Sequence, residues 1–389
     1  MVPRRAALCA LVGAALLAIA QSSAAGDGLK VHEWGTFTSI AGADGRAVEW
    51  APLSGPDDLP CFVHRFEGNG SLKSGLIGTV RMETPVLYFY APQEQTITTK
   101  VLFPRGLITE WYPRAELGPI PGAEGRGRSN ELSNGAIAWR NVSISPHAEP
   151  TLVTEGNASH YYAARAVEAA PLRVGAEQEL FLFYRGVGRF SPPISARARE
   201  DGAVVVENLT NDTIGSMILF ERRGSKIGYR ILDTRMQRKR VSIERPPLAA
   251  DIADLHHEIE RLLVREGLYP REAKAMLETW RDGWFEEGTR LLYLVPRRTI
   301  DAELPLSIAP RPVETVRVFM GRLEVITPAT LDAVEEAIVT SDRATLERYG
   351  RFVIPILQRV PAVRDHKVDH EKLNLLLASN TSAKAPACQ

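Results

Sequence analysis

Carboxylates stand beside aromatic residues at three points of the sequence. These are Glu83 in RMETPVLYFY, Glu110-Trp111 in TEWYP, and Trp284 with Glu286 in GWFEEG. Sugar-binding clefts combine aromatic faces with carboxylates, and two carboxylates can divide the roles of acid and nucleophile in glycoside hydrolysis. We therefore predict catalytic roles for Glu83, Glu110 and Glu286, and ligand contacts for Trp111 and Trp284.

A histidine and a further aromatic residue lie close together in KVHEWGTFTSI, residues 30–40. Because side chains alternate between the two faces of a strand, His32 and Trp34 share one face. We predict that this face lines a cleft and that both side chains bind ligand. His160, beside two tyrosines in HYYAARAV, is predicted as a third ligand contact of the same kind.

The opposite face of the same segment carries Glu33 with Phe37, so the carboxylate points among apolar neighbours. An unpaired carboxylate in such surroundings costs several kcal/mol or shifts its pKa upward. We predict that Glu33 is a buried anchor paired with an arginine, and the candidate partners from strong strand segments are Arg81, Arg165 and Arg185.

Metal and cofactor sites are not predicted. His32, Glu33 and His160 have the right side-chain types for metal binding, but they lie in separate segments. His366 and His370 have helical i,i+4 spacing without the glutamate of His-Glu-x-x-His, and we interpret them as a solvated helix face. The sequence also contains no Gly-x-Ser-x-Gly motif and no phosphate-binding glycine loop.

The elements that must position these residues are mostly strands. Short segments rich in Val, Ile, Thr, Phe and Tyr alternate with Gly, Pro, Asn and Asp from about residue 29 to 245, a pattern typical of all-β structure. The predicted strands are 30–40, 81–90, 96–104, 136–144, 160–167, 179–187, 203–209, 216–222 and 226–232. Their number and spacing favour two packed antiparallel sheets.

Helical periodicity begins after Arg245-Pro246-Pro247 and predicts a hairpin of two helices, followed by strands at 290–297 and 314–326. A helix from Thr327-Pro328 to Ile338 and another over 342–360, interrupted at Pro355, complete the chain. The predicted fold class is mainly β with α: an antiparallel β-sandwich, a helical insertion and a C-terminal α/β segment. Residues 26–247 form the sandwich, and residues 248–378 pack on it.

The two ends of the chain predict an exported protein. Arg4-Arg5 precede an apolar run and small residues, which indicates a signal peptide over 1–25, and 379–389 is expected to be a disordered tail. Periplasmic or extracellular localisation follows. With 47 basic and 47 acidic residues, no bulk attraction to nucleic acid or membrane is expected. Cys61 is expected to be a small buried residue, and a disulfide to Cys388 remains an alternative.

Several longer motifs together resemble an uncharacterised family of exported bacterial proteins. They are HEWGTFTSI, RMETPVLYFY, TEWYP, HYYAAR, LFYRGVG, TWRDGWFEEG and VRVFMGR, and they span nearly the whole mature chain. The resemblance implies a bacterial, exported protein that folds as a single unit. It implies no activity and no catalytic residue.

Two functions remain open from the sequence. The first is binding or hydrolysis of a carbohydrate-like or other small polar ligand at an aromatic and carboxylate-lined site. The second is a non-catalytic structural or protein-interaction module of the periplasm, whose charged strand residues only lock the fold. No spacing among the candidate residues decides between these two functions. The sequence also leaves the oligomeric state open.

Overall fold

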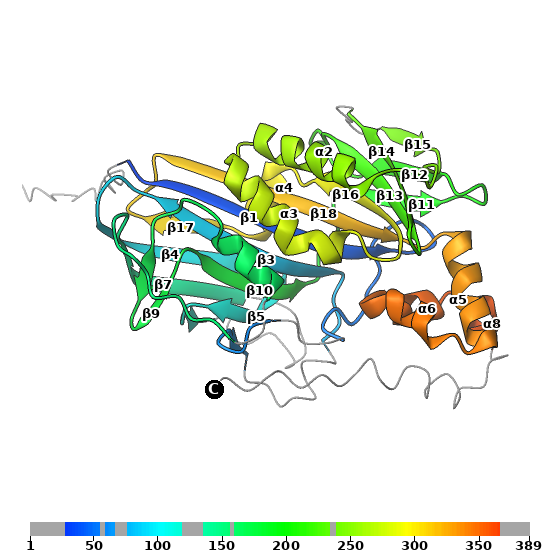
Figure 1. The fold of residues 1–389 in the computed structure, drawn as a ribbon, viewed down its shortest axis with the longest axis horizontal. Helices are drawn as coiled ribbons and strands as arrows, with labels where there is room; N and C mark the ends of the chain where they lie inside the picture. Colours follow the sequence, from blue (N-terminus) through cyan, green and yellow to red (C-terminus); the bar gives the residue numbers. More distant parts are fainter. Residues whose placement is uncertain are drawn as a thin grey trace, which may run out of the picture.

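A sheet of nine strands forms the centre of the computed structural model, which describes residues 28–54, 59–66, 76–118, 135–155, 159–233 and 239–365 (Figure 1). Its strands run in the order β14 (Lys226–Leu232), β13 (Met217–Arg223), β16 (Gly288–Leu294), β18 (Glu314–Val325), β1 (Lys30–Ala41), β3 (Val80–Tyr90), β10 (Leu182–Gly188), β5 (Gly106–Tyr112) and β2 (His64–Arg65). β1 and β18 are parallel, whereas the other neighbouring strands of this sheet are antiparallel.

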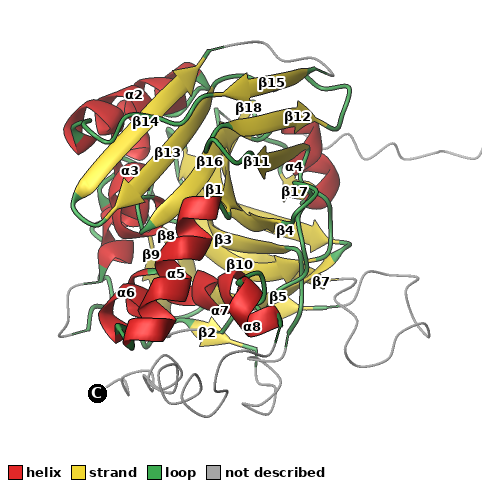
Figure 2. Cartoon of the chain, turned by 90° about the vertical axis from the view of Figure 1, so that its right-hand side faces the viewer, coloured by secondary structure: helices red, strands yellow, loops and turns green. Residues whose placement is uncertain are grey.

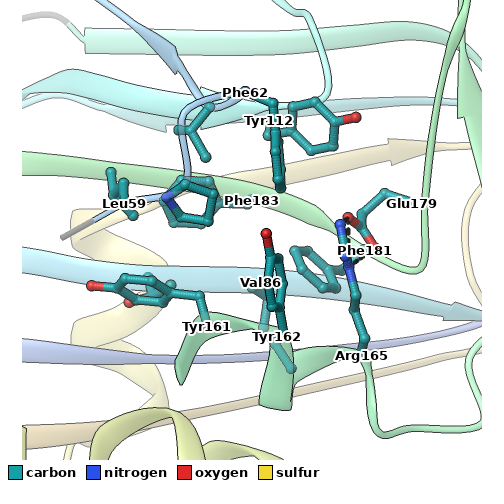
Figure 3. A pocket seen from close by; sticks show the side chains of 14 residues that line it. Leu59, Phe62, Val86, Tyr112, Tyr161, Tyr162, Arg165, Glu179, Phe181 and Phe183 are labelled. Carbon is teal, nitrogen blue, oxygen red and sulfur yellow. Dashed lines mark hydrogen bonds and ion pairs between the residues drawn. The ribbon is translucent and has the colours of Figure 1, made fainter. Parts of the chain in front are cut away.

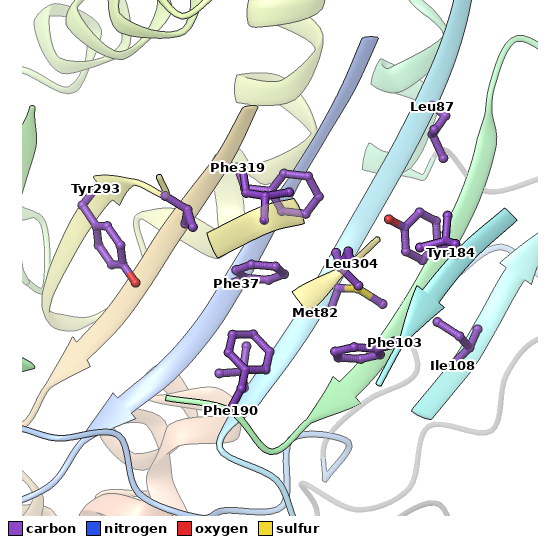
Figure 4. Close-up of a cluster of buried hydrophobic side chains, with 14 of the residues drawn as sticks. Phe37, Met82, Leu87, Phe103, Ile108, Tyr184, Phe190, Tyr293, Leu304 and Phe319 are labelled. Carbon is purple, nitrogen blue, oxygen red and sulfur yellow. The ribbon is translucent and has the colours of Figure 1, made fainter. Parts of the chain in front are cut away.

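Two smaller antiparallel sheets cover one face of the central sheet. One contains β17 (Leu306–Ala309), β4 (Gln95–Phe103), β7 (Gly135–Ile144), β8 (Leu172–Val174) and β9 (Glu177–Glu179), with β6 (Glu116–Leu117) paired to β7; the other contains β11 (Ile194–Ala198), β12 (Val204–Asn208) and β15 (Arg240–Ile243). Between the layers lies an apolar core in which Phe37, Met82 and Phe319 of the central sheet meet residues such as Phe103 (Figure 4). The prediction of a mainly β fold with added helices is therefore confirmed.

The predicted helical hairpin is present and covers the other face of the central sheet. It consists of α2 (Ile252–Arg265) and α3 (Pro270–Trp284), which cross that face in Figure 1. The side chain of Asp251 caps α2 by accepting a hydrogen bond from Ala253 N, and Pro270 occupies the first turn of α3, where its missing N–H costs nothing. Both helices bury an apolar stripe against Trp34 and Tyr88.

The segment HYYAARAV is not a strand. His160–Arg165 forms the 3₁₀ helix η1, which packs on α3. The Ser159 side chain accepts a hydrogen bond from Tyr161 N and turns the backbone away from the extended conformation. The buried residues of η1 are Tyr161 and Ala164, three positions apart, as in a helix and not as in a strand.

The chain returns to the central sheet after the hairpin, as predicted. β16 and β18 lie between β13 and β1, so residues beyond 247 supply two inner strands of the sheet. Between them runs α4 (Arg297–Glu303), which contacts β18. Among the described residues, no helix has both the length and the apolar character needed to cross a membrane.

The C-terminal helices lie together at one end of the molecule (Figure 2). They pack around a third apolar core that includes Ile40 and Trp50. They are α5 (Pro328–Thr340), α6 (Arg343–Arg348), η2 (Gly350–Phe352), α7 (Val353–Leu357) and α8 (Pro361–Arg364). The helix predicted over 342–360 breaks near Gly350, which has a φ of 49°, and not at Pro355. Pro355 is accommodated because it lies in the first turn of α7, where N–H groups have no partner within the helix.

Candidate functional site: an aromatic pocket beside a belt of buried charges

Register shifts occur at one level of the central sheet in three successive strand pairs. They lie between Trp34 and Thr36 in the pairing of β1 with β3, between Phe183 and Gly186 in that of β10 with β3, and next to Arg185 in that of β10 with β5. Thr84, in the same region of β3, has a φ of 47°. β-bulges change the direction of side chains and are common next to functional sites, so this region is where a site is expected.

A narrow aromatic pocket opens beside these bulges and has a cavity volume of about 30 Å³ (Figure 3). Its walls come from β3, β5, β9, β10, η1 and the segment 59–63. The lining residues are Leu59, Pro60, Phe62, Val63, Thr84, Val86, Tyr112, Tyr161, Tyr162, Ala164, Arg165, Glu179, Phe181 and Phe183. The lining is therefore dominated by ring faces from segments far apart in the chain.

An ion pair forms one wall of this pocket. Arg165 donates to both carboxylate oxygens of Glu179, with its Nη2 lying 2.6 Å from Oε2. The same guanidinium lies 4.8 Å from the ring centre of Tyr162 and 5.6 Å from that of Phe62. Burial raises the pKa of Glu179, and Arg165 opposes this shift. The pair thus holds η1 against β9 and keeps the two rings in place.

Two residues of the pocket lining carry a hydroxyl that is buried without a hydrogen-bond partner among the described residues. They are Tyr112 and Thr84. Burial, with the nearby carboxylates of Glu177 and Glu179, raises the pKa of Tyr112 to about 12, so its hydroxyl keeps a proton to donate at neutral pH. A buried unpaired hydroxyl costs free energy, which a polar atom of a ligand would recover.

The loop segment beside the pocket is held by several bonds. Cys61 forms a disulfide, which corrects the expectation that it is merely a small buried side chain; the other cysteines, Cys9 and Cys388, lie outside the described residues. Cys61 N also donates to Glu155 Oε2 at 3.0 Å. Three residues on, His64 Nε2 lies 2.8 Å from Glu177 Oε1. This side of the pocket is therefore fixed to its neighbours.

The three predicted catalytic carboxylates lie in a belt of buried and half-buried ion pairs. We define this charge belt as Glu83, Glu110, Arg185, Glu286 and Arg322. Glu286 accepts a hydrogen bond from Arg322 Nη2 at 2.7 Å, and Glu110 lies 3.9 Å from Arg185 Nε. Burial alone would lower the pKa of Arg322, but nearby carboxylates, those of Glu286 and Glu83 among them, raise it overall. Glu83 lies 3.7 Å from Arg81 Nε and 3.4 Å from Arg351 Nη1. Glu110 lies two strands away from Glu83.

Further ion pairs continue the charge belt across the sheet. Arg290 Nε donates to Glu324 at 3.0 Å, and both side chains are almost completely buried. Further along the sheet, on β13, the Glu221 carboxylate accepts hydrogen bonds from Arg245 and from Arg223. None of the predicted catalytic carboxylates lines the aromatic pocket. Their pairing with arginines is what a structural role in fixing strand register requires.

The expectation that His32 and Trp34 face a cleft is wrong, because α3 covers both side chains. His32 is 1% exposed and its Nδ1 lies 2.8 Å from Glu272 Oε2, while Trp34 is fully buried. Tyr90 donates to the same carboxylate at 2.8 Å. Trp284, at the end of α3, is buried as well and donates from Nε1 to Thr36 Oγ1.

The remaining predicted ligand contacts also lie outside the pocket. The His160 ring lies 4.1 Å from that of Tyr161, and Trp111 lies beside His64. Each is the sequence neighbour of a residue that does line the pocket, Tyr161 and Tyr112 respectively. The sequence analysis missed Phe62, Tyr112, Tyr161, Tyr162, Phe181 and Phe183. If HYYAAR had been predicted as a helix, Tyr161 and Tyr162 would have been candidates for pocket residues.

Glu33 is a buried anchor paired with an arginine, as predicted. Its partner is Arg317 of β18, and not Arg81, Arg165 or Arg185. The Tyr184 hydroxyl donates a second hydrogen bond to this carboxylate.

Neither a cluster of metal-binding side chains nor a similarity to known proteins assigns a function to this site. Within the described ranges, no group of three or more His, Cys, Asp or Glu side chains is arranged to hold a metal ion. The His366 and His370 pair lies outside those ranges. Neither family models nor curated proteins match the sequence significantly.

Proposed function

We propose that the protein binds a small carbohydrate-like ligand at the mouth of the aromatic pocket, whose narrow cavity admits one substituent of the ligand. The observation that carries the proposal is the combination of many ring faces with the two unpartnered hydroxyls of Tyr112 and Thr84. The apolar face of a sugar ring packs on aromatic side chains, and its hydroxyls pair with buried polar groups. The proposal includes export of the protein from the cytoplasm. The disulfide of Cys61 supports export, because disulfides persist in oxidising compartments.

Binding is favoured over hydrolysis by the placement of the carboxylates. Hydrolysis needs two carboxyl groups on either side of the bond that is cleaved. Glu83, Glu110 and Glu286 lie outside the pocket lining, and Glu179 is the one carboxylate among the lining residues, where Arg165 holds both of its oxygens. We therefore assign Glu179 a positioning role toward Arg165 and not an acid role.

Calorimetric titration with a panel of monosaccharides and short oligosaccharides tests the proposal. Binding of a sugar should also raise the melting temperature, because it stabilises the folded state by mass action. Tyr112→Phe removes one hydroxyl and should weaken the affinity about tenfold, equivalent to about 1.4 kcal/mol.

Trp111→Phe is the matched control, since Trp111 adjoins Tyr112 in β5 but does not line the pocket. It should leave the affinity unchanged. Sugar binding that both variants weaken equally would place the site elsewhere. If the wild-type protein released reducing sugar from the oligosaccharides of the panel, hydrolysis would be favoured over binding alone.

The second candidate is a non-catalytic structural or interaction module. The charge belt favours it, because buried ion pairs between neighbouring strands fix register without any need for a ligand. No binding of any sugar in the panel, in a protein that is folded and stable, would support this second function against the first.

A further inference from the structure

A second concave surface lies away from the aromatic pocket, between α4 and β17. It has a volume of about 510 Å³ and is open to solvent. The lining residues are Arg297, Asp301, Pro305, Leu306, Ser307, Ile308, Arg311, Pro312, Thr315 and Arg317. We call this surface the basic groove because three of its residues are arginines.

Positive charge exceeds negative charge in the basic groove. Asp301 is the one acid among its lining residues, and it accepts hydrogen bonds from both Arg297 and Arg317. Arg311 is exposed and forms no ion pair with any described residue. The groove therefore offers a guanidinium group that its own carboxylate does not neutralise.

Arg317, which lines this groove, carries a buried donor without a partner in the part of the chain that the structure describes. Its side chain is 1% exposed; Nε donates to Glu33, while Nη1 donates to Asp301 at 2.8 Å and to the carbonyl of Leu304 at 2.9 Å. Its Nη2 is buried and has no hydrogen-bond partner among the described residues. A buried guanidinium N–H without an acceptor is costly, and an oxyanion in the groove would satisfy it.

Backbone donors add to the same side of the groove. β17 pairs with β4 on one side and has no strand on its other side among the described residues. The carbonyl of Pro305 accepts a hydrogen bond from Leu102 N of β4 and therefore points toward that strand. Because the backbone groups of successive residues point to opposite sides of a strand, the N–H groups of Leu306 and Ile308 point away from β4.

We propose that the basic groove binds the carboxylate or phosphate group of a small anionic ligand. Arg311 at the rim and Nη2 of Arg317 at the floor provide charge-assisted donors, which bind planar or tetrahedral oxyanions more strongly than neutral groups do. This site is separate from the aromatic pocket and does not depend on the sugar-binding proposal.

Calorimetric titration with inorganic phosphate, and separately with citrate, at constant ionic strength tests this site and shows which oxyanion it prefers. Arg311→Ala should weaken the affinity at least about fivefold, because it removes a charge-assisted hydrogen bond. Asp301→Asn should strengthen it about threefold, because it removes the one acidic side chain of the groove lining. Arg317 is left intact in these variants, since its replacement would leave the buried Glu33 carboxylate without its ion-pair partner.

Arg298→Ala is the matched control. Arg298 belongs to α4, as do Arg297 and Asp301, but it lies outside the groove lining. Its Nη1 lies 3.6 Å from Asp212 Oδ1. Its loss should leave anion affinity unchanged. Equal weakening by Arg298→Ala and Arg311→Ala would show unspecific attraction to a basic surface and overturn the proposal. Absence of saturable binding of both anions to the wild-type protein would overturn it as well.

Discussion

Glu33 and Arg317 are direct neighbours across the parallel ladder of β1 and β18, and their side chains are 0% and 1% exposed. Each has a further partner, because Tyr184 donates to Glu33 and Arg317 donates to Asp301. The pair connects the buried core with the basic groove. It also joins positions 284 residues apart in the chain.

Glu33→Gln should lower the free energy of unfolding by about 3–5 kcal/mol, because it removes the buried counter-ion of Arg317 and leaves only the half-exposed Asp301. Urea unfolding followed by circular dichroism measures the change. Glu314→Gln is the control: Glu314 pairs with Lys30 at the start of the same ladder, where the two side chains are 46% and 44% exposed. That variant should cost less than about 1 kcal/mol. Equal losses would show that burial of the pair is irrelevant.

His32→Ala should lower the free energy of unfolding by about 2–4 kcal/mol, since it creates a cavity under α3 and removes a partner of the buried Glu272 carboxylate. His257→Ala, at an exposed position of α2, should stay within about 0.5 kcal/mol of the wild type. Chemical denaturation of both variants checks this. A His32→Ala protein of wild-type stability would show that the contact with Glu272 contributes nothing.

Gly321→Ala should destabilise the protein by about 1–3 kcal/mol through overpacking. Gly321 is paired with Tyr293 on the neighbouring strand, and a Cβ at this position would overlap the buried Tyr293 ring. Gly215→Ala provides the comparison, because a Cβ there meets no atom within 4 Å. Its melting temperature should match that of the wild type, and a similar loss in both variants would contradict the packing argument.

Stability should fall as the pH rises from 10 to about 12. The folded state holds the pKa of Tyr112 at about 12, whereas in the unfolded chain this group ionises near the ordinary value of 10. A raised pKa means that the folded state retains the proton longer, so increasing pH in this window favours unfolding. Other buried tyrosines, such as Tyr88 and Tyr184, contribute in the same direction.

Tyr112→Phe should make this alkaline loss of stability less steep without abolishing it. Unfolding free energies measured at several pH values in this window, for both proteins, provide the test. Identical slopes for wild type and variant would show that Tyr112 ionises equally in the folded and unfolded states.

Strand alternation was enough to predict the two faces of β1 but not what covers them. It correctly separated Glu33 from His32, because successive side chains point to opposite faces. The cover over His32 is α3, whose Glu272 lies 240 residues further along the chain. Contacts over such distances leave no local pattern, so a buried histidine and one lining a cleft look alike in the sequence.

The pocket residues were missed for a related reason. Tyr161 and Tyr162 lie in a segment whose composition is typical of a strand, yet a single capping hydrogen bond from Tyr161 N to Ser159 accompanies a helical turn. The ion pair of Arg165 with Glu179 also could not be predicted, since it depends on how η1 docks beside β9. By contrast, the two-helix hairpin had a clear period and clear ends, and the structure confirms it.

The position of β1 between β3 and β18 has a consequence for the growing polypeptide. A ribosome produces β1 first among the described strands and β18 last, so one edge of β1 stays unfilled until β18 has been made. Until β18 arrives, β14, β13 and β16 cannot join the strands from β1 to β2. The native topology is thus completed only after translation passes Val325, and high contact order of this kind slows folding and prolongs exposure to aggregation.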